Sequence, residues 1–491
     1  MPKGGPKLNN ISKNFTTRDS LGVEGVSTSM QAEICPIVNT VTPRAFYWPF
    51  MIWIYYDFYK YSGIPDHTVP AFDAYLKRQD YFFVLATLLT EGSDQNNLVG
   101  KQQSQIDIDD NPAGPYPFNP AYFKTRYGGM QYYNAGCLSM YFITDQDPNN
   151  DKDLAFPALR PEGEEMAKAF EAVIKDTEYY KSYRRNDKAV PRSVLEEYGK
   201  VINIGLKGFD KCKSLLRHYM FEDDRAIQLK TRSQQLTECS NYLEVIVKDN
   251  KVEELNTSVC RSLFYDRLLP SGKELMIPDA CADIASKWEI VVGRMYFTSG
   301  LEMFWKYMLE QLNEPLTIKE WISQTLKQSD FNWDLQKPLS SVVGECNYSF
   351  EEREAMIAAT SRRNTSSYSM ENGLKIILSV YNRFHNRTDL GDGKVFLDLG
   401  IDSQSISMSE MFDLVEAFME KPIQSFIISI MQSWIVDQHY LTALDKMIQG
   451  RDGFYYEIID GRYVKKHDFD MDFQGIRMIQ LAQVMRDLDM L

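Results

Sequence analysis

The chain has 491 residues and a mass of 56.9 kDa, which exceeds one typical hydrophobic core and predicts two or three domains. Its net charge of −14 argues against a protein whose whole surface binds nucleic acid or anionic lipid, although a local basic patch remains compatible with it. The seven cysteines form no CxxC pair and there are only five histidines, so we expect no disulfide framework, no metal site and no cofactor.

The N-terminal part of the sequence is rich in aromatic residues. Residues 1–20 predict a flexible arm. A Gly-, Ser- and Thr-rich lead-in then reaches a dense aromatic block: Phe46, Tyr47, Trp48, Phe50, Trp53, Tyr55, Tyr56, Phe58, Tyr59 and Tyr61. The apolar spacing predicts helices over 49–61 and 71–90. Pro49 and Asp57 interrupt the apolar run, which is too short to span a bilayer, so we expect a cytoplasmic protein that does not enter a membrane.

The next segments predict the rest of an N-terminal domain over 21–180. Proline, glycine and aspartate predict a loop over 101–125, and a short helix is expected after Gly129. A polar loop follows, and a helix begins at Pro161. This order is similar to that of a winged helix, and a helical hairpin with a long loop is the alternative.

Basic and aromatic residues alternate just after this domain. The basic residues are Lys181, Arg184, Arg185, Lys188 and Arg192, and Tyr179, Tyr180 and Tyr183 lie among them. Such a mixture can bind phosphates and stack on bases, while a solvated helix end followed by a linker is the ordinary interpretation. Together with Arg44, Trp48 and Trp53, these basic residues are our candidates for contact with a partner or with nucleic acid. We expect charge reversal at Arg184 and Arg185 to weaken such binding without unfolding the chain.

The remainder of the sequence is predicted to be helical, with a helical core domain over 194–330 and a C-terminal domain over 350–491. The segment 286–312 is long and apolar and predicts a central core helix. Thr317 with Glu320, and Ser407 with Glu410, predict capping boxes. Residues 328–350 and 385–410 are irregular, with a short strand over 394–399. A long helix is expected over 423–449, a hairpin at Asp460–Gly461 and a final helix over 475–491. The predicted fold class is therefore mainly α, with small β-hairpin elements.

The chain contains none of the common catalytic motifs. A phosphate loop, a dinucleotide-binding GxGxxG, a GxSxG elbow and an HExxH pair are all missing from the sequence. Asp437 and His439 lie two residues apart on a predicted helix and therefore point in different directions, which favours a structural histidine. Asp389, Asp392 and Asp398 do not follow the spacing of a calcium loop. We predict no catalytic residue.

Six blocks at the two ends of the chain carry a further signal: LGVEGVSTSMQAEICPIVNTVTPRAFYW, NLVGKQ, RYGGMQYYNAGCLSM, LRPEGEEMAKAFE, QHYLTALDKMIQGRDGFYYEI and GIRMIQLAQVMRDLDML. They resemble a family of uncharacterised bacterial proteins that is associated with anti-phage defence loci. The family has glycine where this chain has Ile37. The resemblance implies a non-enzymatic component of a defence complex, whose partners are other protein subunits, with nucleic acid as a further candidate. A metal-dependent nuclease with dispersed acidic residues, and a purely structural interaction protein, are the alternatives.

Overall fold

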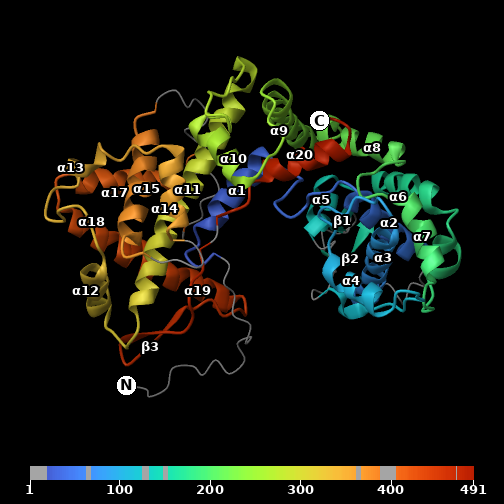
Figure 1. The fold of residues 1–491 in the computed structure, drawn as a ribbon, viewed down its shortest axis with the longest axis horizontal. Helices are drawn as coiled ribbons and strands as arrows, with labels where there is room; N and C mark the ends of the chain where they lie inside the picture. The colour runs from blue at the N-terminus through green and yellow to red at the C-terminus, as the bar shows by residue number, and fades with distance from the viewer. Residues whose placement is uncertain are drawn as a thin grey trace. The chain divides into compact units, whose positions relative to one another are not determined.

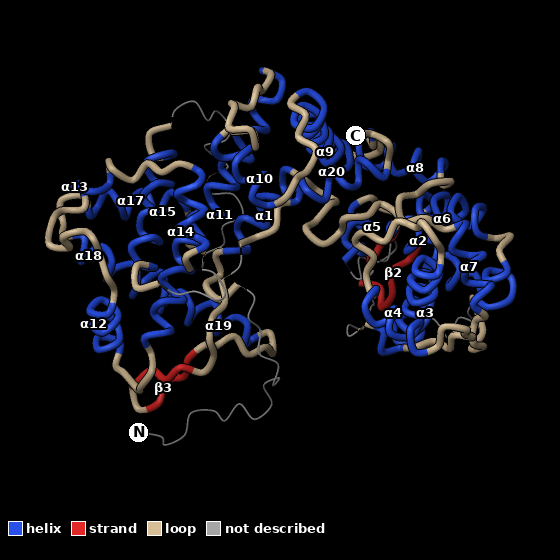
Figure 2. The backbone as a smooth tube through the Cα atoms, viewed as in Figure 1, coloured by secondary structure: helices blue, strands red, loops and turns tan. Residues whose placement is uncertain are grey.

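The computed structural model describes residues 19–61, 68–123, 132–146, 153–360, 366–387, 397, 405–471 and 473–491. Across these residues the protein is mainly α-helical, and its strands form two antiparallel pairs, as Figure 2 shows. This confirms the predicted fold class. The predicted strand over 394–399 and the aspartates at 389, 392 and 398 lie outside the described residues, apart from Leu397.

The chain divides into two compact units. The first unit comprises Met1–Gln31 and Leu255–Gly475, and the second comprises Ala32–Glu254 and Ile476–Leu491. The C-terminal helix therefore belongs to the same unit as the aromatic N-terminal block. The predicted core domain over 194–330 is divided between the two units, and the predicted domain boundaries remain a prediction.

The second unit holds the aromatic block in its core. Its elements are α2 (Tyr47–Tyr61), α3 (Val69–Leu89), α4 (Lys101–Asp110), α5 (Asn134–Ser139), β1 (Ile143–Gln146), β2 (Asp153–Leu159), α6 (Pro161–Ile174), α7 (Arg192–Val201), α8 (Asp210–Arg217), α9 (Ile227–Glu244) and α20 (Arg477–Asp487). Phe46 stacks on Phe83 at 4.6 Å between ring centroids, and Phe170 stacks on Phe209 at 5.0 Å. These large buried rings supply much of the apolar area that the unit removes from water.

One segment of the second unit departs from the sequence prediction, and another agrees with it. Helix α4 forms over Lys101–Asp110, where a loop was predicted, because the turn-forming residues begin only at Pro112 and the preceding glutamines and isoleucines support a helix. Gly100 precedes it with a φ of 83°. Strands β1 and β2 pair with Ile143 opposite Leu159, and α6 begins at Pro161 as predicted. The winged-helix arrangement remains a prediction.

The first unit is built around a long buried helix. Its elements are α10 (Thr257–Arg261), α11 (Ala282–Gln311), α12 (Ile318–Gln328), α13 (Ser340–Val343), α14 (Phe350–Ala358), α15 (Ser369–Phe384), α17 (Met408–Phe418), α18 (Ile423–Ser429), α19 (Gln438–Ile448), β3 (Tyr456–Ile459) and β4 (Arg462–Lys465); α1 (Glu24–Ile34) begins in this unit. Helix α15 lies alongside α11 (Figure 1). A Cβ at Gly300 would come within 2.9 Å of the Gly373 carbonyl oxygen, so the two backbones meet at this glycine pair.

Local signals in the first unit agree with the predictions. Both capping boxes form, at Thr317 with Glu320 and at Ser407 with Glu410. Strands β3 and β4 form the predicted hairpin, and the turn residues Asp460 and Gly461 both have positive φ, as a two-residue hairpin turn requires.

His439 on α19 anchors the N-terminal segment of the first unit. The backbone N–H of Tyr455 donates to Nε2 at 3.2 Å, so Nδ1 carries the ring proton and donates to the Ser20 carbonyl oxygen at 2.9 Å. The ring is fully buried and lies 4.5 Å from the Trp305 ring. Its role is structural.

Acid is expected to destabilise this contact. Burial lowers the pKa of His439 to about 4, and an unfolded histidine has a pKa of about 6.5. Because the unfolded state binds the proton first, stability should fall by about 3 kcal/mol as the pH drops from about 6.5 to about 4. Urea unfolding at several pH values, for the wild type and His439→Gln, measures this contribution. An equally steep pH dependence in both proteins would contradict the assignment.

Candidate functional site

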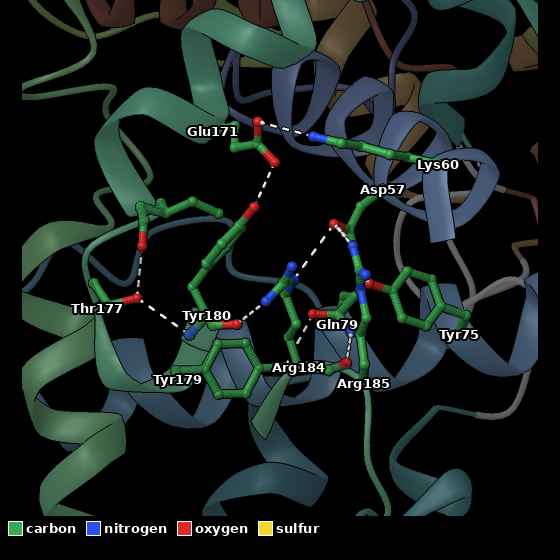
Figure 3. A network of polar contacts seen from close by, with 11 residues as sticks. Asp57, Lys60, Tyr75, Gln79, Glu171, Thr177, Tyr179, Tyr180, Arg184 and Arg185 are labelled. Carbon is green, nitrogen blue, oxygen red and sulfur yellow. Dashed lines mark hydrogen bonds and ion pairs between the residues drawn. The ribbon is translucent and has the colours of Figure 1, made fainter. Parts of the chain in front are cut away.

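A buried carboxylate organises one face of the second unit. Asp57 on α2 has no exposed side-chain surface. It accepts hydrogen bonds from Nε of Arg184 at 3.4 Å, from Nε of Arg185 at 3.0 Å, and from the hydroxyl of Tyr75 on α3. Figure 3 shows both guanidinium groups converging on this carboxylate. A buried charge requires such partners, which explains an aspartate within the otherwise apolar α2.

The segment that carries the two arginines is held in place by further polar contacts. Tyr179 donates through its hydroxyl to Oε1 of Gln79 at 3.0 Å, and the amide of Gln79 donates to the Arg184 carbonyl oxygen at 2.8 Å. The Tyr180 hydroxyl donates to Glu171 on α6 (Figure 3). Burial and the nearby Asp57 carboxylate raise the pKa of Tyr75 well above its usual range, so its hydroxyl stays protonated. These contacts make residues 179–185 part of the folded unit, whereas a linker was the ordinary interpretation.

A cavity of about 370 Å³ adjoins this network, and we call it the arginine–tyrosine cavity. It is lined by Asp57, Phe58, Tyr61, Ala71, Ala74, Tyr75, Arg78, Phe118, Arg184, Arg185 and Asp187. Its rim reaches solvent, because Tyr61 is 47% exposed and Asp187 is also exposed. Aromatic walls with a few charged groups are typical of small-ligand pockets.

Arg78 has an unusual environment in this cavity. Its side chain is buried, and Nη2 donates to the backbone carbonyl oxygens of Tyr183 at 3.2 Å and Lys188 at 3.4 Å. The guanidinium lies 4.7 Å from the Phe82 ring centroid. Its buried Nε has no hydrogen-bond partner, and no described carboxylate forms an ion pair with Arg78. Within the described part of the chain, Arg78 is thus a buried cation without an ion-pair partner.

The predicted candidates outside this segment lie in the core. Arg44 is 1% exposed, and Trp48 and Trp53 are fully buried. Arg44 forms ion pairs with Asp487 on α20 at 3.0 Å and with Asp94 at 2.8 Å. In this structure these three side chains stabilise the second unit and present no surface to a partner.

The remaining basic candidates differ in exposure. Lys181 and Lys188 are exposed and do not line the cavity, although the backbone carbonyl oxygen of Lys188 accepts a hydrogen bond from Arg78, which does. Arg192 is half-buried and pairs with Glu196 at 2.7 Å. The structure therefore brings Arg184, Arg185 and Lys188 together.

The sequence analysis did not identify four residues of the cavity as site candidates: Tyr61, Tyr75, Arg78 and Phe118. Asp57 had been noted only as an interruption of an apolar helix. A charged residue in such a helix was the available signal, because a buried aspartate needs a cationic partner elsewhere in the chain.

Comparison with protein-family models, with curated proteins and with solved structures gives no match for this chain. Within the described ranges, no group of three or more His, Cys, Asp or Glu side chains is arranged to hold a metal ion. The described helices also include none with the length and apolar character that crossing a membrane requires.

Proposed function

We propose that this chain is a non-enzymatic component of a prokaryotic anti-phage defence complex, and that it contacts nucleic acid at the arginine–tyrosine cavity of its second unit. The place in a defence complex, with other protein subunits as partners, is supported by the sequence blocks that resemble the defence-associated family. The contact with nucleic acid rests on one observation, which is the grouping of Arg78, Arg184 and Arg185 with exposed aromatic surface around one cavity.

The chemistry of the cavity suits a nucleic-acid strand. Guanidinium and ammonium groups neutralise phosphates, and aromatic rings stack on bases whatever the sequence. Tyr61, whose ring also lies against the Arg185 guanidinium, and the half-buried Phe118 offer such rings. Lys188, whose backbone carbonyl oxygen accepts from Arg78, adds an exposed positive charge nearby. Since the whole chain carries a net charge of −14, binding should be confined to this patch and involve few phosphates.

Lys188 and Tyr61 are exposed and form no hydrogen bond to Asp57, so their replacement keeps the hydrogen bonds of the buried carboxylate, although Tyr61→Ala also removes the ring that lies against the Arg185 guanidinium. Lys188→Glu and Tyr61→Ala are expected to weaken the binding of a fluorescent single-stranded oligonucleotide, measured by anisotropy. Loss of the stacking ring should cost about 1–3 kcal/mol. Lys188→Glu should also flatten the dependence of affinity on salt between about 50 and about 200 mM.

Lys230→Glu is the matched control, because Lys230 is an exposed lysine on α9 of the same unit and does not line the cavity. It makes the same change in net charge. Equal weakening by Lys188→Glu and Lys230→Glu would show that only the overall charge matters, and would remove the cavity from the proposal.

A further inference from the structure

The strongest unexplained feature of the molecule is the positive charge of Arg78. Burying a charged group without an ionic partner is costly, and a buried N–H that donates to nothing adds to that cost. Asp57 and Arg184 are also buried charges of the cavity, and they are paired with each other, with Arg185 as a second partner of Asp57. Among the described residues that line the cavity, Arg78 is the buried cation without an ion-pair partner.

The sequence of α3 leaves space beside this group. Ala71 lies three and four residues before Ala74 and Tyr75, and Arg78 lies four and three residues after them, so all four share the face of α3 that lines the cavity. The two alanines fill little volume, which leaves room in front of the arginine for a ligand. At about 370 Å³ the cavity has the size of a pocket for one small ligand and cannot admit a duplex.

We propose that the arginine–tyrosine cavity binds a phosphate monoester carried by the terminal nucleotide of a single strand, with Arg78 as its principal cation. This rests on the proposed function of the same site. The Arg78 guanidinium, which belongs to a residue that lines the cavity, donates to a phosphoryl oxygen, and the attached base lies against the aromatic wall that includes Phe118. A guanidinium suits this role because it presents several donors to a phosphate at once.

The binding of different phosphate sources to the full chain tests this inference. The probes are inorganic phosphate, a nucleoside 5′-monophosphate, and otherwise identical single-stranded oligonucleotides with either a phosphate or a hydroxyl at the 5′ end or at the 3′ end. We expect one phosphorylated end to bind at least about tenfold more tightly than its hydroxyl counterpart, because a hydrogen bond to a charged group is lost. Equal affinities for all of these ends would overturn the inference.

Arg78→Met separates a ligand-binding arginine from a structural one. It should abolish the preference for a phosphorylated end, while the melting temperature of the unliganded variant stays equal to that of the wild type or rises, since an uncompensated buried charge has been removed. Arg232→Met is the control, because Arg232 is half-buried on α9 and bonds to the Ser139 carbonyl oxygen. A persistent end preference in Arg78→Met would contradict the inference; if that variant does not fold, the comparison of ends in the wild type decides.

A circular single strand distinguishes failure of this inference from failure of the proposed function. Equal binding of circular and linear strands, still weakened by Lys188→Glu, would refute the end-binding cavity and retain nucleic-acid binding near it. In another outcome, the chain binds the nucleoside monophosphate, Arg78→Met abolishes that binding, and no strand binds. This result would refute the proposed function and would show that the phosphate does not come from a nucleic-acid strand. The phosphate site itself would remain.

Discussion

The double variant Arg184→Glu, Arg185→Glu is expected to unfold the second unit or to destabilise it by at least about 3–5 kcal/mol. Asp57 has no exposed surface, and these two guanidinium groups are its ionic partners. Charge reversal would leave a buried carboxylate without a cation and place two more carboxylates beside it. The arginines were expected to tolerate charge reversal if they served only to bind nucleic acid, and the observed contacts predict the opposite outcome.

Hydrogen exchange of the full chain measures this effect where it should occur. Peptides from α2 and α3 should lose protection in the double variant, because these helices contribute Asp57 and Tyr75 to the network. The control is Lys181→Glu, Lys188→Glu, which makes the same change in charge at two exposed neighbours and should alter stability by no more than about 0.5 kcal/mol. Protection that is unchanged in both variants would show that the Asp57 network does not stabilise the unit.

The sequence predicts features of this fold that depend on neighbouring residues. Examples are both capping boxes, the Asp460–Gly461 hairpin and the central helix α11. The capping boxes and the hairpin turn depend on residues a few positions apart, and the helix depends on a continuous apolar segment. The loop predicted over Lys101–Asp110 failed because aspartates near its end resemble turn residues, although the segment before Pro112 has no helix breaker.

The candidate site could be predicted only in part, because exposure and pairing are tertiary properties. The sequence located the basic cluster around Arg184, but Arg185 meets its partner Asp57 across 128 residues, and Arg78 enters the cavity from another helix. Ile37 is a further example. Its φ of 68° is the left-handed conformation that favours glycine, and an isoleucine in the sequence does not signal that conformation.

Arg44 was a candidate for contact with a partner or nucleic acid because it is an arginine, but its buried place in the second unit gives it a structural role. Its Nε and Nη2 donate to the two carboxylate oxygens of Asp487, each at 3.0 Å, and Nη1 donates to the Asn96 carbonyl oxygen at 2.9 Å. The backbone N–H of Ala45 also donates to Asp487. The segment before α2 and the C-terminal helix α20 are thereby joined within the second unit. Burial raises the pKa of Asp487, and the charge of Arg44 opposes that rise.

Arg44→Met is therefore expected to destabilise the second unit by about 3–5 kcal/mol, because it leaves the nearly buried Asp487 carboxylate without its cation. The double variant Arg44→Met, Asp487→Leu should recover much of this loss, since apolar residues of similar volume often replace a buried ion pair at little cost. Denaturant unfolding of the wild type, both single variants and the double variant gives the coupling energy, and hydrogen exchange in α20 assigns it to this unit.

The sign of the coupling decides between two roles for Arg44. A buried ion pair makes the two single losses far from additive, so that the double variant is more stable than Arg44→Met alone. The loss in Arg44→Met should also be smaller at low pH, because the unpaired Asp487 carboxyl then takes up a proton and no buried charge remains. Additive losses that do not depend on pH would show that the pair contributes little to stability. Arg44 would then contribute to the unit mainly through its other contacts, with Asp94 and the Asn96 carbonyl oxygen.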